Sequence, residues 1–495
     1  MKEYKTLEKV FKKLSDIDRA KSVLEWDMAV NMPEGGAAAR SDQLATLQAI
    51  GHAIGTDDGV GDLIGAAKDN EKKLNDWQKS NLKAICRYWN HNNAVPAKLL
   101  TDLTKAGAEC GMVWRKARAE NDFKTFAPYL DKVVKLVREV AKAKSDAFNC
   151  SPYDALIDQF DPGLKTEQLD KIFDNLKEFL PGFIQEVVEK QKSQPALIPI
   201  KGPFPIEKQK AISEKMLEVV GFDLKTGRLD ESHHPFCGGY PSDIRITTRY
   251  NEDEFFSSLM GVLHECGHAM YEAGLPKNWD GQPVGEALGM SVHESQSLLI
   301  EMQVCRSKEF LKFLLPIIRK EFGGKGKAWN IDNVVRHYHK VEPSLIRVDA
   351  DEVTYPAHVM LRYYLEKYLI AGDMEVADLP DAWAQGMEKF LNIKPDTDRD
   401  GCMQDIHWTD GSFGYFPSYS IGAIYASQLF NAAKASDDTI LKNIEKGKLK
   451  PIQTWLNKNV HSLGCKLSTA DLMTKATGKD IDVEGYKAYL KDRYL

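Results

Sequence analysis

The residues best suited to chemistry lie in one short run, HECGH at positions 264–268. On a helix, residues four apart share a face, so His264 and His268 can bind one Zn²⁺ while Glu265 points at a water beside it. With 12 histidines in 495 residues, HExxH would arise by chance in only about one or two of every hundred such chains. The alternative is two ordinary histidines one turn apart. We therefore predict a metal site with Glu265 as general base.

Spacing alone does not identify a third metal ligand. A catalytic zinc commonly takes three protein ligands and keeps one position for water. No histidine follows the HECGH run until His293, so a carboxylate further along the chain is expected. Two of the candidates fall on one predicted helix, and each could instead be a solvated carboxylate on a helix face. The candidates are Glu272, Glu286, Glu294 and Glu301, of which Glu286 and Glu294 share that helix.

The elements that must position these residues are mostly helical. Asn251 and the acidic residues at 252–254 indicate a helix start, and Gly274 and Pro276 indicate its end. Apolar residues recur at helical spacing from Leu7 to Ile17, so the chain opens with an amphipathic helix. Prolines crowd residues 195–205, which cannot be helical and are expected to join two halves. Residues 243–249 alternate like a short strand directly before the metal helix.

The composition excludes some functions. Lys and Arg number 66 against 72 Asp and Glu, a net charge of −6, without the basic cluster of a nucleic-acid surface. The start of the chain has no unbroken apolar stretch typical of a signal peptide, and runs such as 313–318 are too short to span a bilayer. The eight cysteines are scattered, which favours free thiols. A cytoplasmic protein without membrane or nucleic-acid partners is expected.

Five motifs in the same order resemble the carboxypeptidase Taq family of zinc metallocarboxypeptidases. The likeness runs from about residue 24 to the C-terminus, with no departure at these motifs. They are HPF at 234–236, DxRxT at 243–247, HECGH at 264–268 with HESQ at 293–296, IRxxAD at 346–351, and GxxQDxHW at 401–408.

The resemblance implies a mainly α fold: one body, residues 1–495, with a long substrate groove and a small antiparallel β element, similar to neurolysin and angiotensin-converting enzyme. Its helical N-terminal half would span about residues 1–192 and its metal-bearing half about 206–495. The resemblance further implies that His264, His268 and Glu294 hold one Zn²⁺ per chain, with Co²⁺ accepted. It implies a homodimer that releases single amino acids from peptides with a free C-terminus.

On this interpretation a metal-activated water attacks the scissile carbonyl while Glu265 takes its proton. A second donor to the developing oxyanion is expected by analogy with related groove-shaped peptidases. Tyr415, Tyr419 or His407 could supply it, although each tyrosine could equally be a core aromatic.

A carboxypeptidase also needs a cation for the α-carboxylate of its substrate, and the planar guanidinium of arginine suits this role. Arg347 is the first candidate and Arg245 the second, the alternative for either being a structural salt bridge. His234 could contact substrate or cap a turn. In related folds a strand such as 243–249 offers its edge to an extended peptide, which main-chain hydrogen bonds would align.

Two other functions share parts of this pattern. A metal-dependent oligopeptidase or dipeptidyl carboxypeptidase would use the same metal site without a close carboxylate clamp. A non-catalytic peptide-binding protein would have no use for Glu265 as a base.

Overall fold

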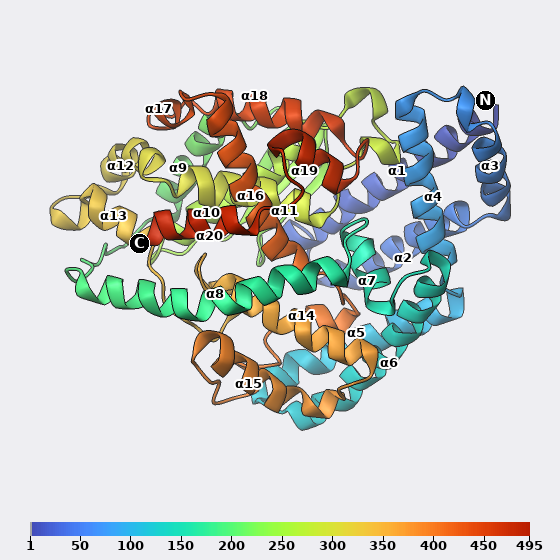
Figure 1. Ribbon diagram of the computed structural model, residues 1–495, viewed down its shortest axis with the longest axis horizontal. Helices are drawn as coiled ribbons and strands as arrows, with labels where there is room; N and C mark the ends of the chain where they lie inside the picture. Colours follow the sequence, from blue (N-terminus) through green and yellow to red (C-terminus); the bar gives the residue numbers. More distant parts are fainter. Residues whose placement is uncertain (1) are drawn as a thin grey trace.

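Helices make up most of the structure, a computed structural model that describes residues 2–495 and so leaves Met1 outside the described residues. Figure 1 shows the first helices, in blue, at one end of the molecule, and α12 and α13 at the opposite end. The predicted mainly α fold is confirmed. Among the described residues, no helix combines the length and the apolar character needed to cross a bilayer.

Eight helices precede the proline-rich segment. In the first, Leu7, Phe11 and Leu14 are buried, as the apolar spacing predicts for an amphipathic helix. The eight are α1 (Lys2–Val30), α2 (Ala37–Gly55), α3 (Asp58–Asp69), α4 (Asp76–Asn93), α5 (Ala97–Glu120), α6 (Phe123–Phe148), α7 (Pro152–Phe160) and α8 (Thr166–Ser193).

Twelve helices follow it. The predicted metal helix is α10, and its start and end agree with the sequence signals to within a few residues. These helices are α9 (Ile206–Val220), α10 (Phe256–Ala273), α11 (Met290–Leu298), α12 (Lys308–Phe322), α13 (Ile331–Tyr338), α14 (Tyr355–Ala371), α15 (Leu379–Leu391), α16 (Pro417–Ser436), α17 (Ile440–Ile444), α18 (Lys450–Asn459), α19 (Thr469–Thr477) and α20 (Val483–Tyr494). A π-helix, η5 (Leu299–Cys305), continues α11.

The hydrophobic core divides near the start of the chain. A small core contains buried residues of α1, α3 and α4, and the larger one begins on α5 and continues through α6–α8 to α20. Residues 194–205 form neither helix nor strand, in agreement with the prediction from the prolines that they cannot be helical. Helices α5–α8 share the larger core with the metal-bearing helices. The distribution of buried residues therefore gives no domain boundary at this segment. The division into halves near 192 and 206 stays a prediction.

The sheet has three strands in the order β1 (Gly227–Glu231), β3 (Asp243–Thr248), β2 (Cys237–Tyr240). Strand β3 pairs antiparallel with β2, as expected for the β element, and parallel with β1. The expectation that this strand offers its edge to a peptide is wrong, because β3 is central and hydrogen-bonded on both sides. Only β1 and β2 have a free edge in this sheet of the described chain.

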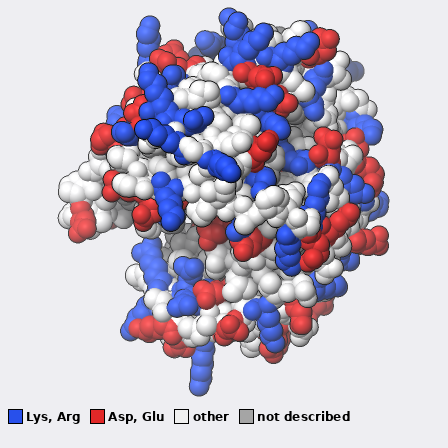
Figure 2. Space-filling view, turned by 90° about the vertical axis from the view of Figure 1, so that its left-hand side faces the viewer, with Lys and Arg blue, Asp and Glu red and all other residues white. Residues whose placement is uncertain are grey.

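Charged side chains of both signs cover the surface. Figure 2 shows Lys and Arg interspersed with Asp and Glu over the face it presents. Such mixing differs from the single-sign field of a nucleic-acid-binding surface.

The C-terminal helix is held by a buried carboxylate. Glu352 lies just before α14, and its side chain is 7 % exposed. It accepts hydrogen bonds from Tyr489 Oη at 2.6 Å, Tyr494 Oη at 2.8 Å and Arg493 Nη1 at 3.0 Å. Burial opposes its ionisation, but Arg493 and the two phenols outweigh burial and lower the pKa of Glu352. A single carboxylate therefore fixes α20 to the segment before α14.

We predict that Glu352→Ala lowers the free energy of unfolding by about 3–5 kcal/mol, because Arg493 would remain buried without a partner. Denaturant unfolding measures the change. Glu484→Ala is the matched control, since Glu484 is an exposed acid in the first turn of α20, and a change within about 0.5 kcal/mol is expected there. Equal effects of the two substitutions would contradict the role of Glu352.

Candidate metal centre and substrate site

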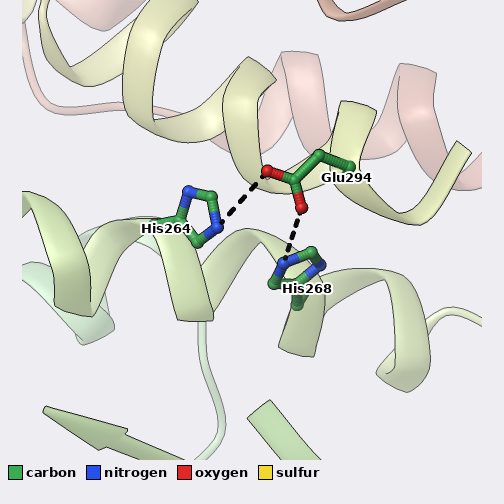
Figure 3. Close-up of side chains that lie close together, drawn as sticks. All are labelled: His264, His268 and Glu294. Carbon is green, nitrogen blue, oxygen red and sulfur yellow. Dashed lines mark ion pairs between the residues drawn. The ribbon is translucent and has the colours of Figure 1, made fainter. Parts of the chain in front are cut away.

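Two helices bring together three side chains that could hold a metal ion. His264 and His268 project from α10 toward Glu294 of α11 (Figure 3). Glu294 Oε1 lies 3.7 Å from His264 Nε2, and Oε2 lies 3.5 Å from His268 Nε2. The ligand atoms of all three residues lie within 4.8 Å of one another. Two imidazoles and one carboxylate are a donor set of catalytic zinc sites, so these residues fit the expected metal.

Two glycines let the helices approach closely enough for this arrangement. A Cβ at Gly267, inside the HECGH run, would lie 2.5 Å from the Gln296 carbonyl oxygen and 2.6 Å from Ser297 Cα of α11. A Cβ at Gly422 of α16 would likewise lie 2.8 Å from Glu294 Cβ of α11. Such distances are far below van der Waals contact. Helix α11 is thus packed tightly against both α10 and α16, which fixes Glu294 opposite the two histidines.

The structure separates the four carboxylates that spacing left open. Glu294 lies between the imidazoles, whereas Glu301 contacts the far nitrogen of His264 and Glu272 contacts His293. Glu286 precedes α11, which begins at Met290, so the expectation that Glu286 and Glu294 share a helix is wrong.

Each candidate histidine ligand has a further hydrogen-bond partner. His264 Nδ1 lies 2.9 Å from Glu301 Oε2, and Glu301 Oε1 accepts from Arg306 Nη2 at 2.6 Å. Burial alone would raise the pKa of Glu301, but Arg306 and His264 lower it to about 2. His268 Nδ1 lies 2.6 Å from His293 Nδ1. Outer partners of this kind fix the orientation and tautomer of a ligand imidazole.

Glu265 is suited to proton transfer near neutral pH. It lies on α10 between His264 and Cys266 and is 8 % exposed. Burial, with the charges of Glu294 and Glu301 adding to it, raises the pKa of Glu265 to about 7. A general base works best when its pKa lies near the working pH. Cys266 itself is fully buried, so its thiol is not accessible to reagents in solvent.

Arg347 is held by the GxxQDxHW motif. Its Nε and Nη2 donate to Asp405 Oδ1 at 3.0 and 2.9 Å, and its Nη1 donates to Tyr355 Oη at 2.7 Å. Its guanidinium carbon lies 5.3 Å from the ring centroids of both Phe416 and Tyr419. Two motifs about 58 residues apart in sequence thus form one cluster.

Three aromatic candidates lie beside this cluster. The rings of Tyr415 and Tyr419 are 5.3 Å apart, and His407 lies 5.7 Å from Tyr415. Burial raises the pKa of Tyr415, and the charge of Glu294 adds to this shift, which relates the phenol to the candidate metal group. Burial, followed by the charge of Arg347, lowers the pKa of His407 to about 4, so this imidazole is neutral at pH 7.

Arg245 contacts the N-terminal helix. It donates through Nε and Nη2 to Asp243 at 2.9 and 2.8 Å, and its guanidinium carbon lies 4.3 Å from the centroid of Trp26 on α1. Arg228 lies 4.5 Å from the same ring. These contacts agree with the alternative role given above for Arg245, a structural salt bridge rather than a contact with substrate.

His234 lies on the loop between β1 and β2, where it is exposed, and its carbonyl accepts from Ser232 Oγ at 2.6 Å. A contact with substrate stays a prediction for this residue.

Sequence reasoning missed Tyr355 and Arg306. Tyr355 lies four residues after the last residue of the IRxxAD motif and precedes Pro356, so its closeness to a named motif is the only signal that the sequence offers. The sequence offers no such signal for Arg306, because only the fold shows that Arg306 pairs with Glu301.

Comparison with known proteins gives a consistent result. Residues 6–494 match the family model of the carboxypeptidase Taq (M32) metallopeptidases. The chain is 35 % identical over 480 residues to thermostable carboxypeptidase 1 of Thermus thermophilus, covering 95 % of this chain and 94 % of that one. It is 33 % identical to carboxypeptidase 1 of Bacillus subtilis, covering 99 % of each. The solved structure of Trypanosoma cruzi metallocarboxypeptidase 1 superposes with a TM-score of 0.98 at 39 % identity, covering 100 % of this chain and 99 % of that one.

We predict that Glu301→Gln lowers the affinity for a divalent metal by about 10–100-fold, because the amide lacks the charge that orients His264. Competition against a chelating dye measures the affinity without relying on activity. Glu286→Gln is the control, since it neutralises a carboxylate of the same sequence region outside the group. Unchanged affinity in Glu301→Gln would show that this contact does not support metal binding.

Proposed function

Since the chain belongs to the carboxypeptidase Taq (M32) metallopeptidase family, we propose that it releases single amino acids from the free C-terminus of peptides in a zinc-dependent reaction. The sequence resemblance is confirmed, and metal-dependent carboxypeptidase activity follows from it. One combination supports the finer proposal. Two imidazole nitrogens and one carboxylate that could hold a metal lie beside Glu265, and a buried cluster of two arginines and one aspartate has a net positive charge.

His264, His268 and Glu294 would hold one Zn²⁺ per chain, with Co²⁺ as a substitute. The donor types support this choice, because imidazole suits zinc and cobalt better than magnesium or calcium. When bound, such a metal lowers the pKa of a coordinated water and polarises a carbonyl group.

Glu265 would carry the proton through the reaction. It accepts a proton from the attacking water and then donates it to the nitrogen of the departing amino acid. Its position beside His264 and its raised pKa support both steps. Tyr415, Tyr419 or His407 would donate a hydrogen bond to the scissile carbonyl oxygen as negative charge develops there.

Arg347 would bind the substrate's α-carboxylate. A guanidinium has five N–H donors, and three of them are used by Asp405 and Tyr355. The two that remain lie on different terminal nitrogens, the arrangement that binds a carboxylate through two parallel hydrogen bonds.

A homodimer in the cytoplasm completes the proposal. The family resemblance supports the dimer. All eight cysteines are free in the structure, which agrees with a reducing compartment.

The function is tested with two peptides blocked at the N-terminus, one with a free C-terminal carboxylate and one amidated. We expect loss of single residues from the free acid only, inhibition by a chelator, and a kcat/KM about 100-fold or more lower in Arg347→Ala. Mass spectrometry identifies the products. Release of dipeptides, or internal cleavage of both peptides, would contradict the single-residue assignment.

Glu265→Gln should bind metal as the wild type does but show a kcat about 10²–10⁴-fold lower, because the amide cannot accept the proton of water. Metal content and circular dichroism provide the folding control. A variant with normal turnover would exclude Glu265 as the base.

A further inference from the structure

A buried carboxylate lies between two arginines next to the proposed substrate site. Asp405 Oδ1 accepts from Arg347, and Asp405 Oδ2 accepts from Arg362 Nε at 2.6 Å. The side chains of Arg347 and Asp405 are each 7 % exposed, and that of Arg362 is 0 % exposed. The side chain of Arg362, on α14, therefore has no exposed surface and cannot contact a substrate directly.

A second bridge fixes the same geometry. Gln404 Oε1 accepts from the backbone nitrogen of Arg347 and from Arg362 Nη2, both at 2.8 Å. The ring of Phe416 lies near both guanidinium groups, with its centroid 5.3 Å from the carbon of Arg347 and 5.4 Å from that of Arg362. The two arginines are thus held as a rigid pair around one carboxylate.

The cluster has an uneven charge balance. Two guanidinium groups and one carboxylate sum to +1. Burial would raise the pKa of Asp405, but Arg362 and Arg347 lower it to about 2, so it is ionised at pH 7. Burial lowers the pKa of the neighbouring His358 to about 3, and this imidazole adds no charge. Glu366, one turn further along α14, directs its oxygens to Tyr153, Trp408 and Gly414 instead.

We propose that Arg362 is a positioning residue that makes the enzyme selective for a free C-terminal carboxylate, by neutralising Asp405 so that the charge of Arg347 stays available. The inference rests on the proposed role of Arg347. Without Arg362, Asp405 and Arg347 would form a neutral pair, and an incoming carboxylate would meet no net positive charge. An acceptor oxygen at residue 405 is still needed to fix the orientation of the Arg347 guanidinium, and asparagine would keep Oδ1 for this role.

A double-mutant cycle tests the charge balance. Arg362→Gln leaves a net charge of 0, Asp405→Asn leaves +2, and the double variant returns to +1. We expect Arg362→Gln to raise the KM of a free-acid peptide about tenfold or more with little change in kcat, and the double variant to recover most of that loss. If Arg362 only supported the fold, the double variant would be at least as impaired as the worse single variant, and the inference would be wrong.

A binding measurement gives a readout independent of turnover. N-acetylphenylalanine and its amide differ only at the carboxyl group, so the ratio of their inhibition constants reports carboxylate recognition. We expect the ratio to fall in Arg362→Gln and to return in the double variant. Lys367→Gln, which removes a partly exposed cation of the same helix paired with Asp170, should leave the ratio unchanged.

Two further variants keep the outcome clear. Arg362→Lys retains the charge and should keep KM near the wild-type value even if Arg362→Gln fails to fold; a large rise in KM in a folded Arg362→Lys protein would contradict the proposal. If Arg347→Ala leaves the KM of the free acid unchanged, the proposed clamp itself fails. If Arg347→Ala raises the KM of the free acid but a folded Arg362→Gln protein does not, the clamp stands and only the role proposed for Arg362 is wrong.

Discussion

The contact of α10 with α11 at Gly267 is the constraint on which the candidate site depends. A side chain at this position would occupy the space of the Gln296 carbonyl and the Ser297 backbone. Because the two helices meet without an intervening side chain, Glu294 reaches both histidines of the preceding helix. Glu301 follows in the same helical run, where η5 continues α11, and so meets His264 from the other side. One close approach therefore sets both the donor group and its outer partner.

Buried charges around the site are compensated in different ways. Glu301 pairs with Arg306, and Glu352 pairs with Arg493, so each of these carboxylates has a guanidinium partner. The cluster at Asp405 has one guanidinium more than it needs for neutrality. A buried charge is costly unless it is paired, so an uncompensated one marks a position that gains from a partner of opposite sign. We infer that the neutral pairs stabilise the structure, whereas the unbalanced cluster is available for the recognition proposed above.

Local spacing predicted the parts of the site that lie within one helix. The four-residue period of HECGH lies within α10, and the acidic residues 252–254 precede that helix, where Glu254 accepts a hydrogen bond from the backbone nitrogen of Ser257. Spacing did not distinguish Glu294 from Glu301 as the third ligand, because both lie in the continuous helix formed by α11 and η5. Only their contacts with α10 show that Glu294 faces both histidines. The contact of Arg245 with Trp26 depends on a segment far away in sequence. The pairing of β3 on both sides depends on the order in which the three neighbouring strands lie in the sheet, which their spacing does not reveal. Helical periodicity predicted the mainly α class, and the family motifs supplied the activity, which periodicity alone would not.

The close packing at Gly267 has a consequence for the choice of ion. Backbone contact, rather than side-chain rotamers, sets the separation of α10 and α11, so the donor group has little freedom to widen. Calcium takes about six to eight oxygen ligands, and magnesium demands a near-octahedral oxygen shell. Two imidazoles and one carboxylate on stiffly packed helices serve neither ion well. On coordination chemistry this donor group therefore favours transition metals over the abundant hard cations.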